Sequence, residues 1–75
     1  MTVIVYTKPG CPSCDNVKSY LRERNIQFDE MVFGRDYTKE QLQEIIPGVT
    51  SVPQVIIDGR VVGGYESTQQ FLTEG

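Results

Sequence analysis

The chain has 75 residues and a net charge of −3, with 39% of its residues hydrophobic and 23% charged. This length provides for one domain, residues 1–75, and its balance of apolar and charged residues is that of a globular rather than a disordered chain. Its apolar runs are too short to cross a membrane, and seven lysines and arginines in an acidic chain argue against nucleic acid as a partner.

Glycine and proline divide the first half of the sequence into three elements. Residues 2–6 are apolar and β-branched, which predicts a strand buried on both faces. Pro12 suits the first helical position, and apolar residues then recur at helical spacing, so we expect a helix over 12–24 with Cys11 at or beside its N-cap and Lys18 facing water. Residues 26–32 predict a second strand.

The second half carries a capping signal and a hairpin signal. Thr38, followed three residues later by Gln41, matches a capping box and predicts the start of a helix. Three apolar residues then form its stripe: Leu42, Ile45 and Ile46. Residues 54–57 and 60–62 predict a hairpin, because the Asp-Gly pair between them favours a two-residue type I′ turn.

A last short helix is expected to begin between Tyr65 and Ser67, after a Gly-Gly break. The element order is then β-α-β-α-β-β-α. A strand–helix–strand unit of this length requires a parallel pair with a right-handed crossover, and the hairpin adds an antiparallel pair. We therefore predict an α/β fold in which one mixed four-stranded sheet is flanked by three helices.

The chemistry is expected at Cys11 and Cys14, which form a C-x-x-C motif between a strand and a helix. A helix N-terminus favours a thiolate, and Lys8 adds positive charge from the preceding loop. Cys11 is therefore expected to be the exposed nucleophile, and Cys14, one turn into the helix, the resolving thiol.

The cysteine pair has two other interpretations. A zinc site or cluster requires more ligands than two cysteines in a chain without histidine, and the absence of histidine also excludes histidine-based acid–base catalysis. A pair of inert buried thiols conflicts with the helix start beside Pro12, where we expect little burial of Cys11. Dithiol–disulfide exchange is the favoured chemistry, with no metal.

The chain resembles the glutaredoxin family in three segments that occur in the family's order. Residues 6–14 are similar to its active-site segment, residues 51–53 to its Thr-Val-Pro segment, and residues 63–66 to its Gly-Gly-aromatic-Asp stretch. The resemblance covers nearly the whole chain. It implies a thioredoxin-like fold with strand order 2-1-3-4.

The resemblance also implies a glutathione or target site. Pro53 would be cis, and the Val52 backbone would pair with the substrate's cysteine segment. Lys8 would meet the glycyl carboxylate of glutathione, and the amides of Tyr65 and Glu66 its γ-glutamyl carboxylate. The full set of binding residues expected around the two cysteines is Lys8, Pro12, Ser13, Val52, Pro53, Gly64, Tyr65 and Glu66.

Simpler interpretations remain open for several of these residues. Tyr6 is more readily a core residue than a ligand contact, and Pro53 also suits the start of an edge strand. The Gly63-Gly64 pair also suits a plain turn, and Lys8 a plain solvated lysine.

The sequence also departs from the family pattern. Ser13 stands where tyrosine is common, and Glu66 where aspartate is usual. The basic or amide position of the second helix falls on Glu40, with Lys39 or Gln41 available if the register slips by one.

The function expected from the resemblance is that of a dithiol glutaredoxin. It would be a cytoplasmic monomer, without a leader or a bound cofactor, that uses glutathione as co-substrate. Its substrates would be protein disulfides and glutathione mixed disulfides, and its targets would include proteins such as ribonucleotide reductase. The alternatives are a small redoxin reduced by thioredoxin reductase and, in a different class, an iron–sulfur carrier bridging two chains through Cys11.

Overall fold

The computed structural model describes the backbone of residues 1–74 and the side chains of residues 1–73. Within residues 1–74, seven elements follow one another: β1 (Val3–Thr7), α1 (Pro12–Glu23), β2 (Asp29–Val32), α2 (Lys39–Ile45), β3 (Gln54–Ile57), β4 (Arg60–Gly63) and α3 (Tyr65–Glu74). This order is the predicted one.

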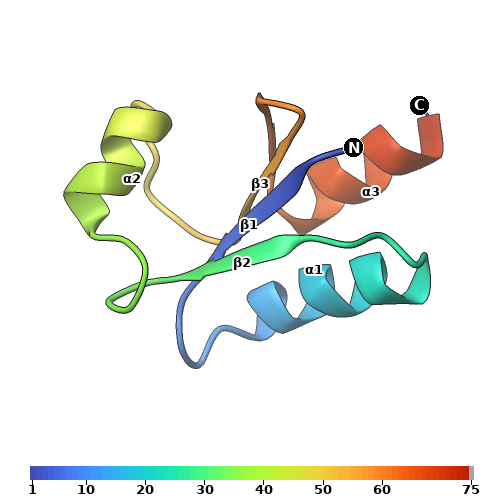
Figure 1. Cartoon of the computed structure of the whole chain (residues 1–75), viewed down its shortest axis with the longest axis horizontal. Coiled ribbons are helices and arrows are strands. Elements are labelled where there is room, and N and C mark those ends of the chain that lie inside the picture. The colour runs from blue at the N-terminus through green and yellow to red at the C-terminus, as the bar shows by residue number, and fades with distance from the viewer. Residues whose placement is uncertain (75) are drawn as a thin grey trace.

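The four strands form a single mixed sheet in the order β2-β1-β3-β4 (Figure 1). β1 runs parallel to β2 and antiparallel to β3, and β4 pairs antiparallel with β3. Asp58 and Gly59 link β3 to β4, both with positive φ (50° and 80°), as a type I′ turn requires. The α/β class, the strand order and the hairpin are therefore confirmed.

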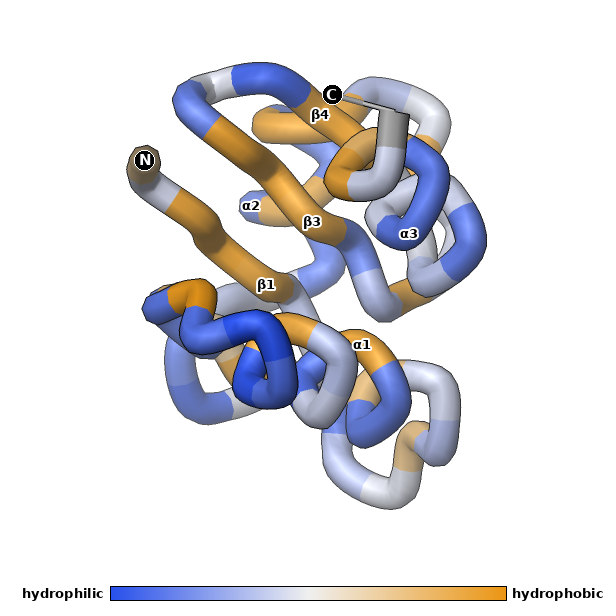
Figure 2. Tube along the Cα trace, turned by 90° about the vertical axis from the view of Figure 1, so that its right-hand side faces the viewer, coloured by the Kyte–Doolittle hydropathy of each residue, from blue (hydrophilic) through white to orange (hydrophobic). Residues whose placement is uncertain are grey.

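Hydrophobic clusters lie on both faces of the sheet. Side chains alternate along β1, so that Val5 joins one cluster with Val17 and Leu21 of α1, while Tyr6 joins the other with Leu42 of α2. α3 also packs on the first face, where it contacts α1. In Figure 2 the apolar colouring runs along β1 and β3, the two inner strands. The prediction that the first strand is buried on both faces is confirmed.

Local signals start the helices where the sequence predicted. Cys11 is the N-cap of α1, and Pro12 occupies its first turn. Thr38 caps α2, and both hydrogen bonds of the capping box with Gln41 are present.

Two predicted elements differ in detail. β2 begins at Asp29 rather than at residue 26, because Asn25 takes a left-handed conformation (φ 59°) and the Ile26 amide still bonds to the Leu21 carbonyl at the end of α1. Ile26 packs on the core without pairing to β1. The predicted apolar stripe of α2 is only partly buried. Ile45 is 46% exposed, because this seven-residue helix buries only part of its stripe against the sheet. No helix among the described residues is long and apolar enough to span a membrane.

Candidate active site

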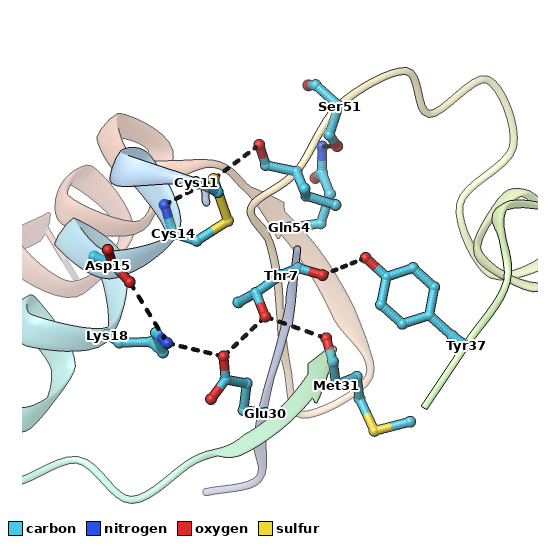
Figure 3. Close-up of a disulfide and its surroundings, with 11 residues drawn as sticks. Thr7, Cys11, Cys14, Asp15, Lys18, Glu30, Met31, Tyr37, Ser51 and Gln54 are labelled. Carbon is cyan, nitrogen blue, oxygen red and sulfur yellow. Dashed lines mark hydrogen bonds and ion pairs between the residues drawn. A yellow bond between two sulfur atoms is a disulfide. The ribbon is translucent and has the colours of Figure 1, made fainter. Parts of the chain in front are cut away.

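Cys11 and Cys14 are joined by a disulfide at the point where the loop after β1 enters α1 (Figure 3). Their Cα atoms lie 5.2 Å apart. The backbone amide of Cys14 donates a hydrogen bond to the sulfur of Cys11, at 3.1 Å. The two cysteines are therefore close enough to form and break a disulfide, and the Cys11 sulfur is the N-cap acceptor of α1.

The burial of Cys11 corrects one expectation. Both cysteines are buried, with 7% of Cys11 and 1% of Cys14 exposed. The segment before β3 covers the outer sulfur, since Cys11 Sγ lies 3.9 Å from the carbonyl oxygen of Val52. Proximity to a helix start does not ensure exposure when a second loop packs over it. The outer cysteine is still the more accessible of the two.

The segment that covers the dithiol contains the only cis peptide bond among the described residues, between Val52 and Pro53. The expected cis geometry is confirmed. The start of α3 lies beside it, because a Cβ placed on Gly64 would be 3.7 Å from the Pro53 carbonyl oxygen. The structure thus brings Cys11, Val52, Pro53 and Gly64 together, from three separate parts of the chain.

A cavity of about 240 Å³ opens next to Val52. Lys8 and Lys39 line it from the loop after β1 and from the first turn of α2, and its apolar lining includes Tyr37 and Leu42. Glu40, on which the family position falls by sequence count, is exposed and does not line this cavity.

Lys39 and Gln41 flank Glu40 in the first turn of α2. Gln41 is committed to the helix cap, where its side-chain oxygen accepts the Thr38 amide at 2.8 Å. Lys39 and Leu42 are the α2 residues that line the cavity, so the charge that α2 brings to it is positive.

Several predicted site residues do not line the cavity. Pro12 and Ser13 are exposed in the first turn of α1, and Glu66 is exposed at the start of α3. Tyr65, the first residue of α3, is half-buried and packs edge-on against Tyr20. Because α3 begins at Tyr65, the amides of its first turn have no acceptor within the helix.

Tyr6 and Tyr37 form the wall behind the cavity. Tyr6 is 6% exposed, which confirms it as a core residue, and it packs edge-on against Tyr37. The Tyr37 hydroxyl donates to the Thr7 carbonyl at 2.7 Å. Burial, with a smaller effect of Tyr6, raises the pKa of Tyr37.

A polar network behind Cys14 was not predicted. Glu30 of β2 accepts hydrogen bonds from Lys18 of α1 and Thr7 of β1, at 2.9 and 2.8 Å (Figure 3). The hydrogen bond from Lys18 is the main reason why the pKa of Glu30 is lowered, against the opposing effect of burial. The prediction that Lys18 faces water is wrong, because only 17% of its side chain is exposed. Its position four residues after Cys14 was the available signal.

A disulfide at a helix N-terminus, covered by a cis-proline loop on a mixed four-stranded sheet, defines a thiol–disulfide oxidoreductase with the thioredoxin-like fold. Residues 3–62 match the model of the family Glutaredoxin. The chain belongs to the glutaredoxin family, whose members are thiol–disulfide oxidoreductases.

Curated and solved relatives agree with this placement. Glutaredoxin 1 of Rickettsia conorii is 35% identical over 77 residues, which span 99% of this chain and 74% of the relative. The structure of reduced Escherichia coli glutaredoxin aligns with a TM-score of 0.84 and 26% identity, over all of this chain and 96% of that one. A hybrid peroxiredoxin of Haemophilus influenzae, hyPrx5, is 34% identical over 71 residues, but these make up 95% of this chain and only 29% of that protein.

Proposed function

We propose that residues 1–75 form one glutaredoxin domain that reduces protein disulfides and glutathione mixed disulfides with electrons from glutathione. The observation that carries the proposal is the pairing of Lys8 and Lys39 on one cavity beside Val52. Glutathione is a tripeptide with a carboxylate at each end, and two ammonium groups suit one of these ends.

The contacts around the disulfide support one orientation of glutathione. Its sulfur would meet Cys11 Sγ, and its cysteine backbone would pair with Val52, whose carbonyl already contacts that sulfur. The glycyl carboxylate would then enter the cavity between Lys8 and Lys39. The γ-glutamyl carboxylate would take the free amides at the start of α3, at Tyr65 and Glu66.

The exposed first turn of α1 leaves room for a protein substrate beside the same sulfur. Pro12 and Ser13 are exposed there, and Ser13 carries no aromatic ring across the approach to Cys11. We assign Pro12 and Ser13 to the surface that receives the substrate's cysteine segment, and Pro53 to the same site as a buried residue beside Val52.

The reaction follows from the order of the two sulfurs. The Cys11 thiolate attacks a substrate disulfide, which forms a mixed disulfide and expels one substrate thiolate. For protein disulfides, Cys14 then loses its proton to solvent and attacks Cys11, which forms the intramolecular disulfide and releases the second thiolate. Two glutathione molecules reduce that disulfide and leave as oxidised glutathione, so no bound cofactor or metal takes part.

Target proteins are proposed as a class of exposed disulfides. Ribonucleotide reductase belongs to this class. A peroxiredoxin is a second candidate, because one relative is named a hybrid peroxiredoxin and contains a region similar to this chain within a longer protein. We place the reaction in the cytoplasm, where the glutathione pool is reducing, and expect a monomer to suffice.

The decisive experiment compares two electron sources for the same protein. Consumption of NADPH is followed with a glutathione mixed disulfide as substrate, in the presence of either glutathione with its reductase or thioredoxin reductase alone. We expect turnover only with glutathione. Turnover only with thioredoxin reductase would show that the chain is a redoxin of the alternative type.

A further inference from the structure

The network behind Cys14 joins three elements through one carboxylate. Glu30 Oε2 accepts the Lys18 ammonium from α1 and the Thr7 hydroxyl from β1, while Glu30 itself lies on β2. Thr7 is 2% exposed, and the Lys18 and Glu30 side chains are 17% and 26% exposed. A charged pair is therefore held half-buried between the first helix and the sheet.

Lys18 lies on the same face of α1 as Cys14. Residues four apart share a helix face, and side chains lean toward the N-terminus, so Lys18 runs back along the face of Cys14. Its contact with Asp15 marks how far it reaches, since Lys18 Nζ is 3.7 Å from Asp15 Oδ1. Figure 3 shows Thr7, Lys18 and Glu30 grouped on one side of the disulfide.

Packing alone does not explain a charged pair at this place. Buried ion pairs contribute little to stability compared with apolar groups of similar size. The same helix shows that apolar residues can fill such a position, because Val17 and Leu21 on its inner face are fully buried. Cys14 is 1% exposed, so water screens the charges near its sulfur poorly.

We propose that Lys18 and Glu30 are positioning residues that set the reactivity of the Cys14 sulfur, with Lys18 favouring its thiolate and Glu30 limiting that effect. Thr7 holds the carboxylate in place through its hydroxyl. The pair acts on Cys14 through its field and touches no substrate.

The step affected is the release of the substrate from Cys11. Cys14 must give its proton to solvent before its sulfur attacks Cys11, forms the Cys11–Cys14 bond and expels the substrate thiolate. A nearby ammonium raises the fraction of Cys14 that is ionised at neutral pH. A nearby carboxylate lowers it.

The remaining charged groups around the dithiol are exposed and less effective. Asp15 on α1 has a side chain that is 75% exposed. Lys8 in the loop after β1 and Glu66 at the start of α3 are also exposed. Arg35, exposed after β2, also acts on Glu30, but its effect is smaller than that of Lys18. Solvent screens these exposed charges more than it screens the half-buried pair.

The test uses two isolated substitutions and their combination: Lys18→Met, Glu30→Gln and the double variant. Reduced protein is mixed with an aromatic disulfide that releases a coloured thiolate. The first release depends on disulfide concentration and reports attack by Cys11. The second release is independent of that concentration and reports attack by Cys14.

The two substitutions are expected to move the second release in opposite directions near neutral pH. Lys18→Met should slow it about threefold, because a tenfold loss of thiolate is partly offset by greater nucleophilicity. Glu30→Gln should accelerate it by a similar factor, since it leaves the ammonium unopposed. The double variant should return toward the original rate, because both charges are gone.

A structural role gives a different pattern. Loss of packing would shift both rates in the same direction, and that result, like unchanged rates, would overturn the proposal. Arg60→Gln is the control, because it removes one exposed positive charge from β4, which carries neither member of the pair, and should leave both phases unchanged. If Lys18→Met does not fold, Glu30→Gln decides the question through the sign of its effect.

Discussion

The amide of Cys14 and the sulfur of Cys11 share a hydrogen bond of 3.1 Å, so the atom that caps α1 is also the outer sulfur of the dithiol. In most helices a serine, threonine or aspartate oxygen has this position. A thiolate there receives an amide hydrogen bond and the field of the helix N-terminus, both of which favour its negative charge. The cap and the nucleophile proposed above are therefore one group.

The two cysteines are expected to fail in different ways when replaced. Cys14→Ser should leave Cys11 able to form a mixed disulfide with a protein target but unable to release it internally, so adducts accumulate. Cys11→Ser should form no adduct. Non-reducing electrophoresis after mixing with a disulfide substrate checks both results. Adducts of equal yield through either cysteine would contradict the assigned roles.

Removal of the cavity lysines should weaken glutathione binding without altering the chemical step. Lys8→Met and Lys39→Met are each expected to raise the KM for glutathione about threefold at unchanged kcat, a loss of about 0.65 kcal/mol that is typical of exposed charge pairs. The double variant should raise it about tenfold. Arg60→Gln provides the control, since Arg60 lies on the β3–β4 hairpin and does not line the cavity. An equal effect of all three single variants would show that only net charge matters.

Two tyrosines offer a matched test of a buried hydroxyl. Tyr37→Phe removes the hydrogen bond to the Thr7 carbonyl and should lower the free energy of unfolding by about 1 kcal/mol. Tyr20→Phe should leave it unchanged or slightly raised, because the buried Tyr20 hydroxyl has no hydrogen-bond partner among the described residues. Urea unfolding of the oxidised proteins measures both. A larger loss for Tyr20→Phe would mean that its hydroxyl has a partner in solution.

Glu30 is expected to contribute to unfolding in acid. Its pKa is lowered in the folded protein, chiefly by the Lys18 hydrogen bond, so its contribution to stability is complete above the ordinary value of 4.5. This contribution falls as the pH drops below that value and is lost once the pH has passed the lowered pKa. The dependence of the urea midpoint on pH measures it, and Glu30→Gln should flatten the slope below pH 4.5.

The acid slope should not vanish in that variant. The pKa of Asp36 is also lowered, mainly by its hydrogen bond with Arg35, so this carboxylate adds to the same slope. Asp36→Asn therefore serves as the comparison. A Glu30→Gln profile that coincides with that of the original protein would show that the ion pair persists in the unfolded chain or does not stabilise the fold.

Local signals explain why much of the fold was predictable. The Asp58-Gly59 turn and the capping box of Thr38 depend on residues a few positions apart, so the sequence contains all of the information that specifies them. The start of β2 was predicted too early, because Ile26 is apolar like a strand residue. In the structure it packs on the core directly after α1.

The site was less predictable because it is assembled from distant segments. The motif identified Cys11 and Cys14, but the burial of Cys11 depends on Val52, 41 residues away. The cis bond before Pro53 was expected only from the family resemblance, since proline sequences are compatible with either isomer. The network of Lys18 and Glu30 joins residues of unrelated elements, and no short motif marks such a contact.

The sheet separates two apolar clusters, and this division has a consequence for how the molecule moves. α1 and α3 lie together on one face, whereas the other face is covered by the seven-residue α2, of which Leu42 is the buried residue. Regions with fewer buried contacts open at lower free energy. We therefore expect α2, which carries Lys39, to open locally at a lower free energy than the face on which α1 holds the two cysteines.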